Sequence, residues 1–493
     1  MKEKLEILTY KHKITLITFL LFLVIGVLSP LGGSDWSSYV IGKQGLVKCF
    51  ENINISDGRI ISGFLVNFFS YNKILFDIVF ALLMSSFVKI CNDLMGTVKN
   101  KHIYLYPLIG VLLVSTYMFS FNYVSISGAV CYTFPTILFF IYFYNILRYE
   151  ELSKRTLIML IIYSLLIMLS SIHIAITFFI ANLIYLILNS NKKNRFYYFI
   201  LLLLQFISLI VSVHFLDSIL IYTEANQVLN NIPYFIDTVF SSNIVIMILG
   251  AIPINYLLGE KLKENRYRRV VITLFDLVLF FSLCYNFFNY SPVNLNLVIN
   301  KYNGIFATEN WYYILYFITY VILFYLSINH FIKNKKLKNI LNILMISCTI
   351  IAIFVLVSPI IDKGNMVFIV FSLIMILCLI AKEIDIKVYS KLVVLVLSLL
   401  IIYYLSMFAI VKYVDSTRSN YIKEQIDAGE TNIEVKANPI QLVWRHNPSD
   451  MFLVKDFKNY YEIPKEDTIE VKYFGIFEKI EKKVKEWKKR WYQ

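Results

Sequence analysis

The chain has 493 residues, of which 58% are hydrophobic and only 16% are charged. Soluble domains carry about 25% charged residues, so this composition, with a mean hydropathy of +0.66, excludes an ordinary soluble protein. The net charge of +14 does not indicate a nucleic-acid partner, because most Lys and Arg lie in short segments between apolar runs, where they set helix orientation. The six cysteines show no metal-ligand spacing and predict no disulfide framework.

Apolar runs long enough to cross a bilayer recur along the chain. The first follows a basic segment but no small-residue cleavage site follows it, so we interpret it as a retained helix and not as a signal peptide. Only Ser171–His173 separates the fifth and sixth runs, which together are too long for one crossing and predict a tight helical hairpin. We predict thirteen spans, near residues 14–30, 73–91, 103–119, 129–147, 156–171, 174–189, 197–216, 239–258, 270–289, 311–331, 340–357, 366–381 and 391–411.

Basic residues alternate between the two sides of these spans. The N-terminal segment and every second connection carry 24 Lys and Arg, whereas the opposite connections carry six. Since cytoplasmic connections are enriched in Lys and Arg, we predict a multi-pass protein of a bacterial plasma membrane with a cytoplasmic N-terminus and an extracytoplasmic C-terminus. The predicted fold class is an all-α polytopic membrane protein, residues 1–411, with a small extracytoplasmic α/β region, residues 412–493.

The first outer connection, residues 31–72, concentrates charge beside apolar runs. Ser34 or Asp35 predicts an N-cap for a helix beginning at Trp36. The helix dipole would hold Asp35 ionised, as a general base requires; the alternative is that Asp35 only caps this helix. The apolar residues that follow fall near one face and predict that the helix lies along the membrane with that face down: Trp36, Tyr39, Val40, Leu46, Val47 and Phe50.

Asp57-Gly58-Arg59 precedes the apolar stretch that leads into the second span. The forked donors of an arginine suit phosphate, so Arg59 is a candidate phosphate ligand near headgroup depth. The alternative is a turn flanked by solvated charges.

These features resemble bacterial glycosyltransferases of the GT-C superfamily. The resemblance rests on the acidic Ser34-Asp35-Trp36 loop after the first span and the Gly58-Arg59 dipeptide before the second. It extends to Ser127–Pro135, a Gly-Ala…Tyr…Pro element at the mouth of the fourth span, and to Arg418 and Tyr421 after the last span. The chain is most similar to the polytopic family DUF6056, and more loosely to the GtrII-type glucosyltransferases.

The resemblance implies sugar transfer outside the membrane from a polyprenyl-phosphate sugar donor to a cell-surface glycan, with inversion at the anomeric carbon. Asp35 would be the catalytic base, and the substrate-binding residues would be Asp57, Arg59, Trp36, Tyr132 and His173. Neutralising the leaving phosphate is a main source of rate in such a reaction. GT-C enzymes often carry two adjacent acids at this position, whereas Ser34 precedes Asp35 here, so no metal ligands are assigned and a bound divalent metal stays an open alternative.

Other ionisable residues lie near the predicted outer face or inside spans. His173 at the hairpin tip, and His214 and Asp217 at the end of the seventh span, can line the same cavity or simply reach interfacial water. Asp77 and Asp276 lie inside spans, where acids are functional candidates or form buried structural hydrogen bonds.

The tail from Lys412 is polar, with strand-like runs at Asn432–Lys436 and Thr468–Tyr473. Its final residues, 475–493, place apolar side chains at helical spacing opposite lysines. This pattern predicts either a helix on an anionic membrane surface or one that packs on the tail's own core.

Two further functions compete with the transferase. A flippase or transporter of lipid-linked glycans should show broken spans in matching positions of two halves, but Pro107, Pro135 and Pro253 do not match across halves. A polysaccharide polymerase shares the many spans but usually has its large outer loop late in the chain, whereas the large loop here comes first.

Overall fold

The computed structural model describes residues 2–53, 59–98, 100–114, 119–149, 153–188, 195–214, 244–263, 265–289, 311–357, 364, 366–384, 390–436 and 451–472. Several predicted features lie outside these residues: Asp57, Asp217, the outer connections 217–238 and 290–310, and the amphipathic segment 475–493.

Seven helical runs among the described residues are long and apolar enough to cross a membrane, which confirms an α-helical membrane protein. They lie at Glu6–Leu28 in α1 (Lys2–Leu28), in α5 (Lys73–Met95), at Ile126–Arg148, in α12 (Arg195–His214), in α18 (Lys335–Val357), in α19 (Met366–Ile384) and in α20 (Ser390–Asp427). Shorter or less apolar helices occupy further predicted spans: α10 (Lys154–Met168), α11 (Ile172–Leu188), α14 (Ile244–Lys261), α15 (Arg268–Asn289) and α17 (Trp311–Phe331).

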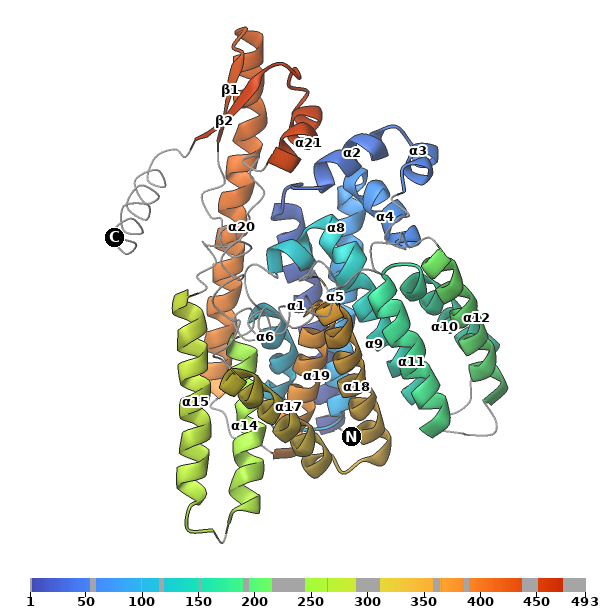
Figure 1. The fold of residues 1–493 in the computed structure, drawn as a ribbon, viewed down its shortest axis with the longest axis vertical. Helices are drawn as coiled ribbons and strands as arrows, with labels where there is room; N and C mark the ends of the chain where they lie inside the picture. Colours follow the sequence, from blue (N-terminus) through green and yellow to red (C-terminus); the bar gives the residue numbers. More distant parts are fainter. Residues whose placement is uncertain are drawn as a thin grey trace.

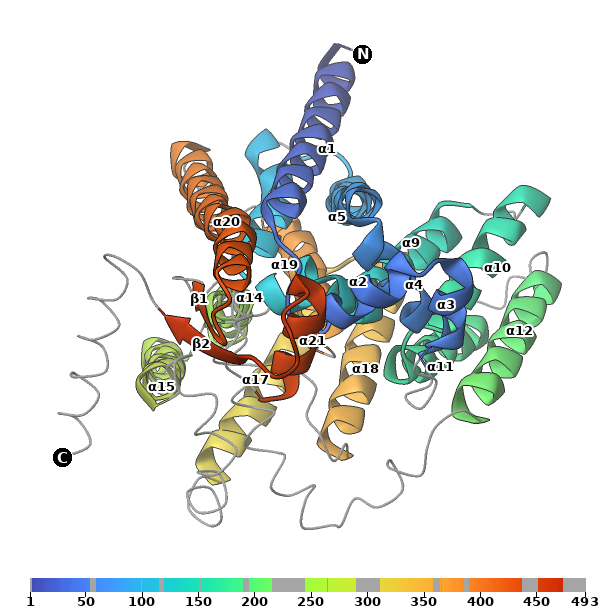
Figure 2. The same ribbon diagram turned by 90° about the horizontal axis from the view of Figure 1, so that it is seen from above.

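Helices α1 and α5 pack closely against each other (Figures 1 and 2). Gly26 makes this approach feasible, because a Cβ there would come within 2.9 Å of an Asp77 carboxylate oxygen. Lys73 donates to the Gly26 carbonyl at 2.6 Å and to Asp77 at 2.9 Å. The Lys73 side chain therefore joins the end of α1 to the start of α5, which are the two helices that the first outer connection links.

The predicted third span is not one continuous helix. A 3-10 turn, η1 (Lys101–Leu105), leads into the short α6 (Tyr106–Leu112). Pro107 lies in the first turn of α6, where its missing N–H costs no helical hydrogen bond. The predicted span near 103–119 therefore begins as a 3-10 turn followed by a short α-helix.

The chain then passes through unusually wide helical turns before the next span. Two of the elements are π-helices, η2 (Phe119–Val124) and η3 (Ala129–Thr133). The short α-helix α8 (Ile126–Gly128) lies between them, and α9 (Phe134–Arg148) follows. π-Helical turns are rare and often occur at functional sites. This irregular segment lies at the end of the bundle that carries the first outer connection (Figure 1).

The predicted hairpin is present. Helix α10 ends at Met168 and α11 begins at Ile172. The tip between them binds α4 (Ile60–Tyr71): the Ile61 N–H donates to the Leu169 carbonyl at 2.9 Å, and the Ser62 hydroxyl donates to the Ser170 carbonyl at 2.6 Å. The hairpin tip therefore fixes the start of α4, where Arg59 lies.

Helix α20 has 38 residues and does not end at the predicted limit of the last span. It continues to Asp427 and stops before Gly429, whose φ of 75° is the left-handed conformation that commonly follows a helix. Two parallel strands follow, β1 (Asn432–Lys436) and β2 (Thr468–Lys472), and α21 (Met451–Tyr461) lies between them in sequence. The strands coincide with the two strand-like runs of the sequence, as far as these runs lie within the described residues.

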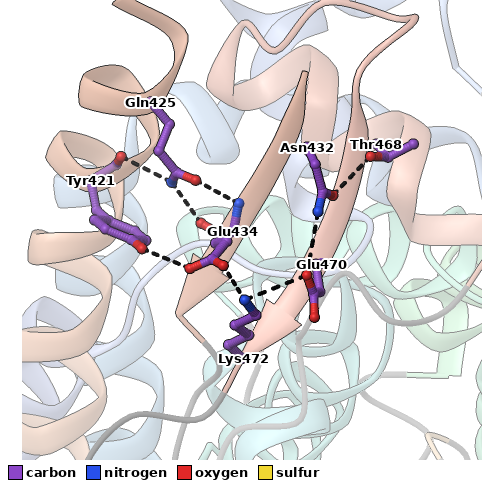
Figure 3. Close-up of polar contacts among 7 residues, drawn as sticks. All are labelled: Tyr421, Gln425, Asn432, Glu434, Thr468, Glu470 and Lys472. Carbon is purple, nitrogen blue, oxygen red and sulfur yellow. Dashed lines mark hydrogen bonds and ion pairs between the residues drawn. The ribbon is translucent and has the colours of Figure 1, made fainter. Parts of the chain in front are cut away.

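A glutamine on α20 covers the edge of β1 that faces the helix (Figure 3). The Gln425 side-chain oxygen accepts from the Glu434 N–H at 2.7 Å, and its NH₂ group donates to the Glu434 carbonyl at 2.8 Å. Arg418 donates to the Lys436 carbonyl at 2.8 Å. Lys472 on β2 pairs with the Glu434 carboxylate. These contacts fix the sheet to the last turns of α20.

Candidate active site

The first outer connection forms two short helices, α2 (Asp35–Lys43) and α3 (Leu46–Glu51), before α4. They lie at the same end of the molecule as α21 and both strands, and the turn between α14 and α15 lies at the opposite end (Figure 1). Seen from above, α21 lies beside α2 (Figure 2).

The Asp35 carboxylate caps a helix other than its own. Its side chain is only 1% exposed. Oδ1 accepts from the Ser127 N–H at 2.9 Å, and Oδ2 accepts from the Ile126 N–H at 3.0 Å and the Ser125 hydroxyl at 3.2 Å. These N–H groups begin the apolar run Ile126–Arg148, and the first N–H groups of a helix have no partner inside it. Asp35 therefore joins the outer connection to the start of a membrane helix.

The prediction that Ser34 or Asp35 caps α2 is wrong. Ser34 occupies the N-cap position, but no side chain accepts from the first N–H groups of α2. A tight turn satisfies them instead: the Asp35 N–H donates to the Gly32 carbonyl and the Trp36 N–H to the Gly33 carbonyl, both at 3.2 Å. Because the turn supplies these acceptors, the Asp35 carboxylate is available to the buried helix start.

Two opposing effects act on the pKa of the Asp35 carboxyl. Burial raises the pKa, because desolvation disfavours the charged form, whereas the hydrogen bonds from Ser127, Ile126 and Ser125 lower it. Burial is the larger effect, so the pKa lies above its ordinary value. A raised pKa brings a carboxylate nearer to the neutral range, in which a general base is most effective.

Serine hydroxyls connect this buried carboxylate with the surface. The Ser34 hydroxyl donates to Ser127 Oγ at 3.0 Å, and the Ser127 hydroxyl interacts in turn with Asp35. Ser34 is exposed and Ser127 is half-buried. A substrate hydroxyl that approaches Ser34 and Ser127 would therefore be one hydroxyl group away from the carboxylate.

The apolar residues after Asp35 do not form one face. Gly45, with a φ of 103°, interrupts the helix and separates α2 from α3. The Trp36 ring is fully buried and contacts Phe457 of α21, with ring centroids 4.9 Å apart. Tyr39 contacts Tyr460 of the same helix at 5.2 Å. The expectation that Trp36 and Tyr39 face the membrane is therefore wrong: they bind the C-terminal region.

Helix α3 behaves differently from α2. Leu46, Val47 and Phe50 are 57%, 69% and 61% exposed. Of the apolar residues that the sequence placed on one membrane-facing side, only those of α3 are largely exposed.

Arg59 occupies the N-cap position of α4 and binds Tyr132 of the π-helix η3. Nη2 donates to the phenol oxygen at 2.7 Å, and the guanidinium carbon lies 5.2 Å from the ring centroid. The tyrosine ring is also closely packed against Gly364, because a Cβ there would come within 2.2 Å of a ring carbon. The guanidinium and the positive end of α4 together favour an anion at this point.

His173, the second residue of α11, belongs to the same neighbourhood. The imidazole is close enough to Arg59 for the guanidinium charge to act on it. Its ring also lies 5.8 Å from the ring of Phe354. The side chain is half-buried.

The structure therefore gathers three of the predicted site residues and separates one. Arg59, Tyr132 and His173 come together from three distant segments, and Asp35 binds the residues immediately before η3. Trp36 lies under α21 instead. Sequence reasoning missed Ser125 as a partner of Asp35 and Gly364 as a support for Tyr132. Ser125 before an apolar helical run is a capping signal, whereas nothing in the sequence singles out Gly364.

The intramembrane acids have local partners. Asp77 pairs with Lys73, and Asp276 accepts from the Asn255 side-chain amide at 2.8 Å. Within the described ranges, no three His, Cys, Asp or Glu side chains converge as metal ligands.

Comparison with known proteins adds no relative. No family model, curated protein or solved structure matches this chain.

Proposed function

We propose that this protein is an extracytoplasmic-face glycosyltransferase that moves a sugar from a polyprenyl-phosphate donor to a cell-surface or lipid-linked glycan. The observation that carries the proposal is the convergence of Arg59, Tyr132 and His173 beside the helix start that Asp35 caps. The guanidinium, phenol and imidazole suit phosphate recognition, and the buried carboxylate on the neighbouring segment suits proton removal.

The donor phosphate binds at Arg59. The guanidinium is half-buried, which strengthens its attraction for a phosphate compared with a site in open water. Tyr132 holds the guanidinium by its hydroxyl and by its ring. The arginine side chain is therefore partly immobilised before the donor binds, and binding loses less conformational entropy. His173 provides a second polar side chain at the same opening.

In the transfer step, the acceptor hydroxyl oxygen attacks the anomeric carbon of the donor. The new carbon–oxygen bond forms on the face opposite the phosphate, the bond to the phosphate oxygen breaks, and polyprenyl phosphate leaves with inversion. The acceptor proton passes to Asp35 through the Ser127 hydroxyl, which gives up its own proton to the carboxylate as it takes the acceptor's. Arg59 neutralises the charge that develops on the leaving phosphate.

The C-terminal region helps to enclose the acceptor. Phe457 and Tyr460 of α21 bind Trp36 and Tyr39 of α2, and the Tyr461 hydroxyl donates to Asp415 of α20 at 3.3 Å. In this proposal, residues 412–493 are a small extracytoplasmic α/β region, and its described helix α21 contacts the helix that begins with Asp35.

The proposal includes the thirteen-span topology with the N-terminus in the cytoplasm. Its support is the 24-to-6 division of Lys and Arg between alternate connections. A reporter that works only outside the cytoplasm should be active when it is fused after Gln493. Activity of a reporter that works only in the cytoplasm, fused at the same position, would contradict the topology.

The membrane-glycan composition of a strain lacking this protein tests the function. We expect a side-chain sugar to be missing, and expect the wild-type gene but not an Asp35→Asn variant to restore it. Accumulation of a complete lipid-linked glycan inside the cell would instead favour the transporter, and loss of glycan length with side-chain sugars intact would favour the polymerase.

A further inference from the structure

An apolar cavity of about 270 Å³ lies between α6, α14, α19 and α20, away from the candidate active site. On α20 it reaches Val396, whereas Asp415 contacts the C-terminal region. At about 1.5 Å per helical residue, these two residues are roughly 29 Å apart along the helix. No charged side chain is among the described residues that line the cavity.

Two polar groups interrupt its apolar wall. The Tyr106 hydroxyl is buried and has no hydrogen-bond partner among the described residues. Pro253 lies inside α14, and since proline has no backbone N–H, the Leu249 carbonyl lacks its usual donor four residues ahead. Tyr106, Leu249 and Pro253 all line the cavity. A buried phenol without a partner costs about 1–3 kcal/mol, which a ligand with a suitable acceptor would remove.

One end of the cavity lies next to a basic residue that does not itself line it. Its lining includes Ile384 at the end of α19 and Leu392 near the start of α20. A second hollow on the neighbouring face of α20 is lined by His102, Ser390 and Lys391, among others. Lys391 is exposed, and Lys382 is paired with Glu383 at 3.3 Å. An unpaired buried atom, Nδ1 of His102, lies at this end too.

We propose that this cavity binds an anionic phospholipid. One acyl chain fills the space between the four helices, the Tyr106 hydroxyl donates to the ester carbonyl of that chain, and the phosphate lies against Lys391 and His102. The charge of the rim selects an anionic headgroup, and the apolar wall selects a chain rather than a soluble phosphate. The site is separate from the proposed transferase chemistry and stands without it.

The test is native mass spectrometry of the full-length protein released from vesicles of equimolar phosphatidylglycerol and phosphatidylcholine. We expect the wild type to retain phosphatidylglycerol preferentially. Lys391→Ala should lower that preference roughly fivefold, since one lysine near a membrane surface contributes about 1 kcal/mol towards anionic lipid. Tyr106→Phe should weaken retention of the lipid by roughly fivefold, because one hydrogen bond is lost.

Val396→Trp, which fills the cavity, should remove the retained lipid. Leu399→Trp is the matched control, because Leu399 is on the same helix, is 57% exposed and does not line the cavity; this variant should retain lipid as the wild type does. Equal retention of the two lipids by the wild type, or unchanged preference in both Lys391→Ala and Tyr106→Phe, would overturn the proposal. Lys391→Ala and Tyr106→Phe add no bulk to the helices, so they keep the test valid if Val396→Trp does not fold.

Discussion

Asp35 and Arg59 are charged residues of the same outer connection, but they are bound in different ways. Asp35 is 1% exposed and accepts from two backbone N–H groups and a hydroxyl. Arg59 is half-buried and contacts a tyrosine hydroxyl and ring. The carboxylate is therefore part of the framework of the helix start, whereas the guanidinium is held by a side chain of η3.

Substitutions of the two residues should therefore change different measured properties of the protein. A change at Asp35 alters both the fold and the proposed proton transfer, so stability and activity must be measured together. A change at Arg59 chiefly alters the recognition of an anion. The substitutions below use this contrast, beginning with the largest expected effect.

Asp35→Asn should lower sugar transfer by about 10²–10⁴-fold per folded molecule, because an amide cannot take a proton. The variant should also be less stable by roughly 1.5–3 kcal/mol, the contribution of a hydrogen bond to a charged group, because its NH₂ group would face the Ser127 or Ile126 N–H. Turnover is measured in purified protein and stability by thermal unfolding in the same detergent. Ser125→Ala is the control: it removes one hydroxyl contact to the carboxylate and should lower turnover far less.

Phe457→Ala should release α21 from α2. Phe457 is fully buried against Trp36 and lies 5.9 Å from the Arg418 guanidinium. Removing a buried phenylalanine typically costs about 3–5 kcal/mol, so limited proteolysis should cleave the C-terminal region much faster while the membrane bundle stays folded. Wild-type protease resistance in this variant would show that the ring contacts do not hold the region.

Arg59→Lys should weaken donor binding about tenfold and change turnover less, because the charge remains but the fork is lost. Tyr132→Phe should have a smaller effect, roughly fivefold on the donor KM, since one neutral hydrogen bond contributes about 1 kcal/mol. Initial rates over a range of donor concentrations separate KM from kcat. A larger fall in kcat than rise in KM for Arg59→Lys would argue against a role in recognising the donor.

The smallest expected effect is on the pH dependence of kcat/KM, whose acid limb should reflect the pKa of Asp35. Because burial raises its pKa, the acid limb of kcat/KM should lie above about 3.9, the ordinary value for Asp, and activity should fall as pH drops through the raised pKa. The stability contribution has the opposite sign: it is full below the unfolded-state pKa and is lost as pH rises through the folded-state pKa. An acid limb at or below the ordinary value would exclude Asp35 as the base.

The helical membrane class and the hairpin between α10 and α11 could be predicted from the sequence, because apolar runs and their lengths determine both. The two strands could also be located, since their alternation and β-branched residues are local signals. The break in the third span could not be predicted with confidence from Pro107 alone, because proline is also tolerated in continuous membrane helices.

The sequence suggests the residues of the candidate site but not the partners that they contact. Asp35, Arg59 and Tyr132 are visible as charges and a motif, yet the bond from Ser127 to Asp35 joins residues 92 positions apart. Trp36 shows the same limit. Its apolar character is evident in the sequence, but helical spacing does not show whether the membrane or another helix, here α21, covers it.

The most direct test of the central claim is the stereochemistry of transfer by the purified wild-type protein. The protein is incubated with polyprenyl-phosphate sugars of known anomeric configuration and a membrane-glycan acceptor, and the new linkage is assigned by NMR. We predict a product with the anomeric configuration inverted relative to the donor, and no product with Asp35→Asn. Retention of configuration, or equal product from Asp35→Asn, would contradict the account.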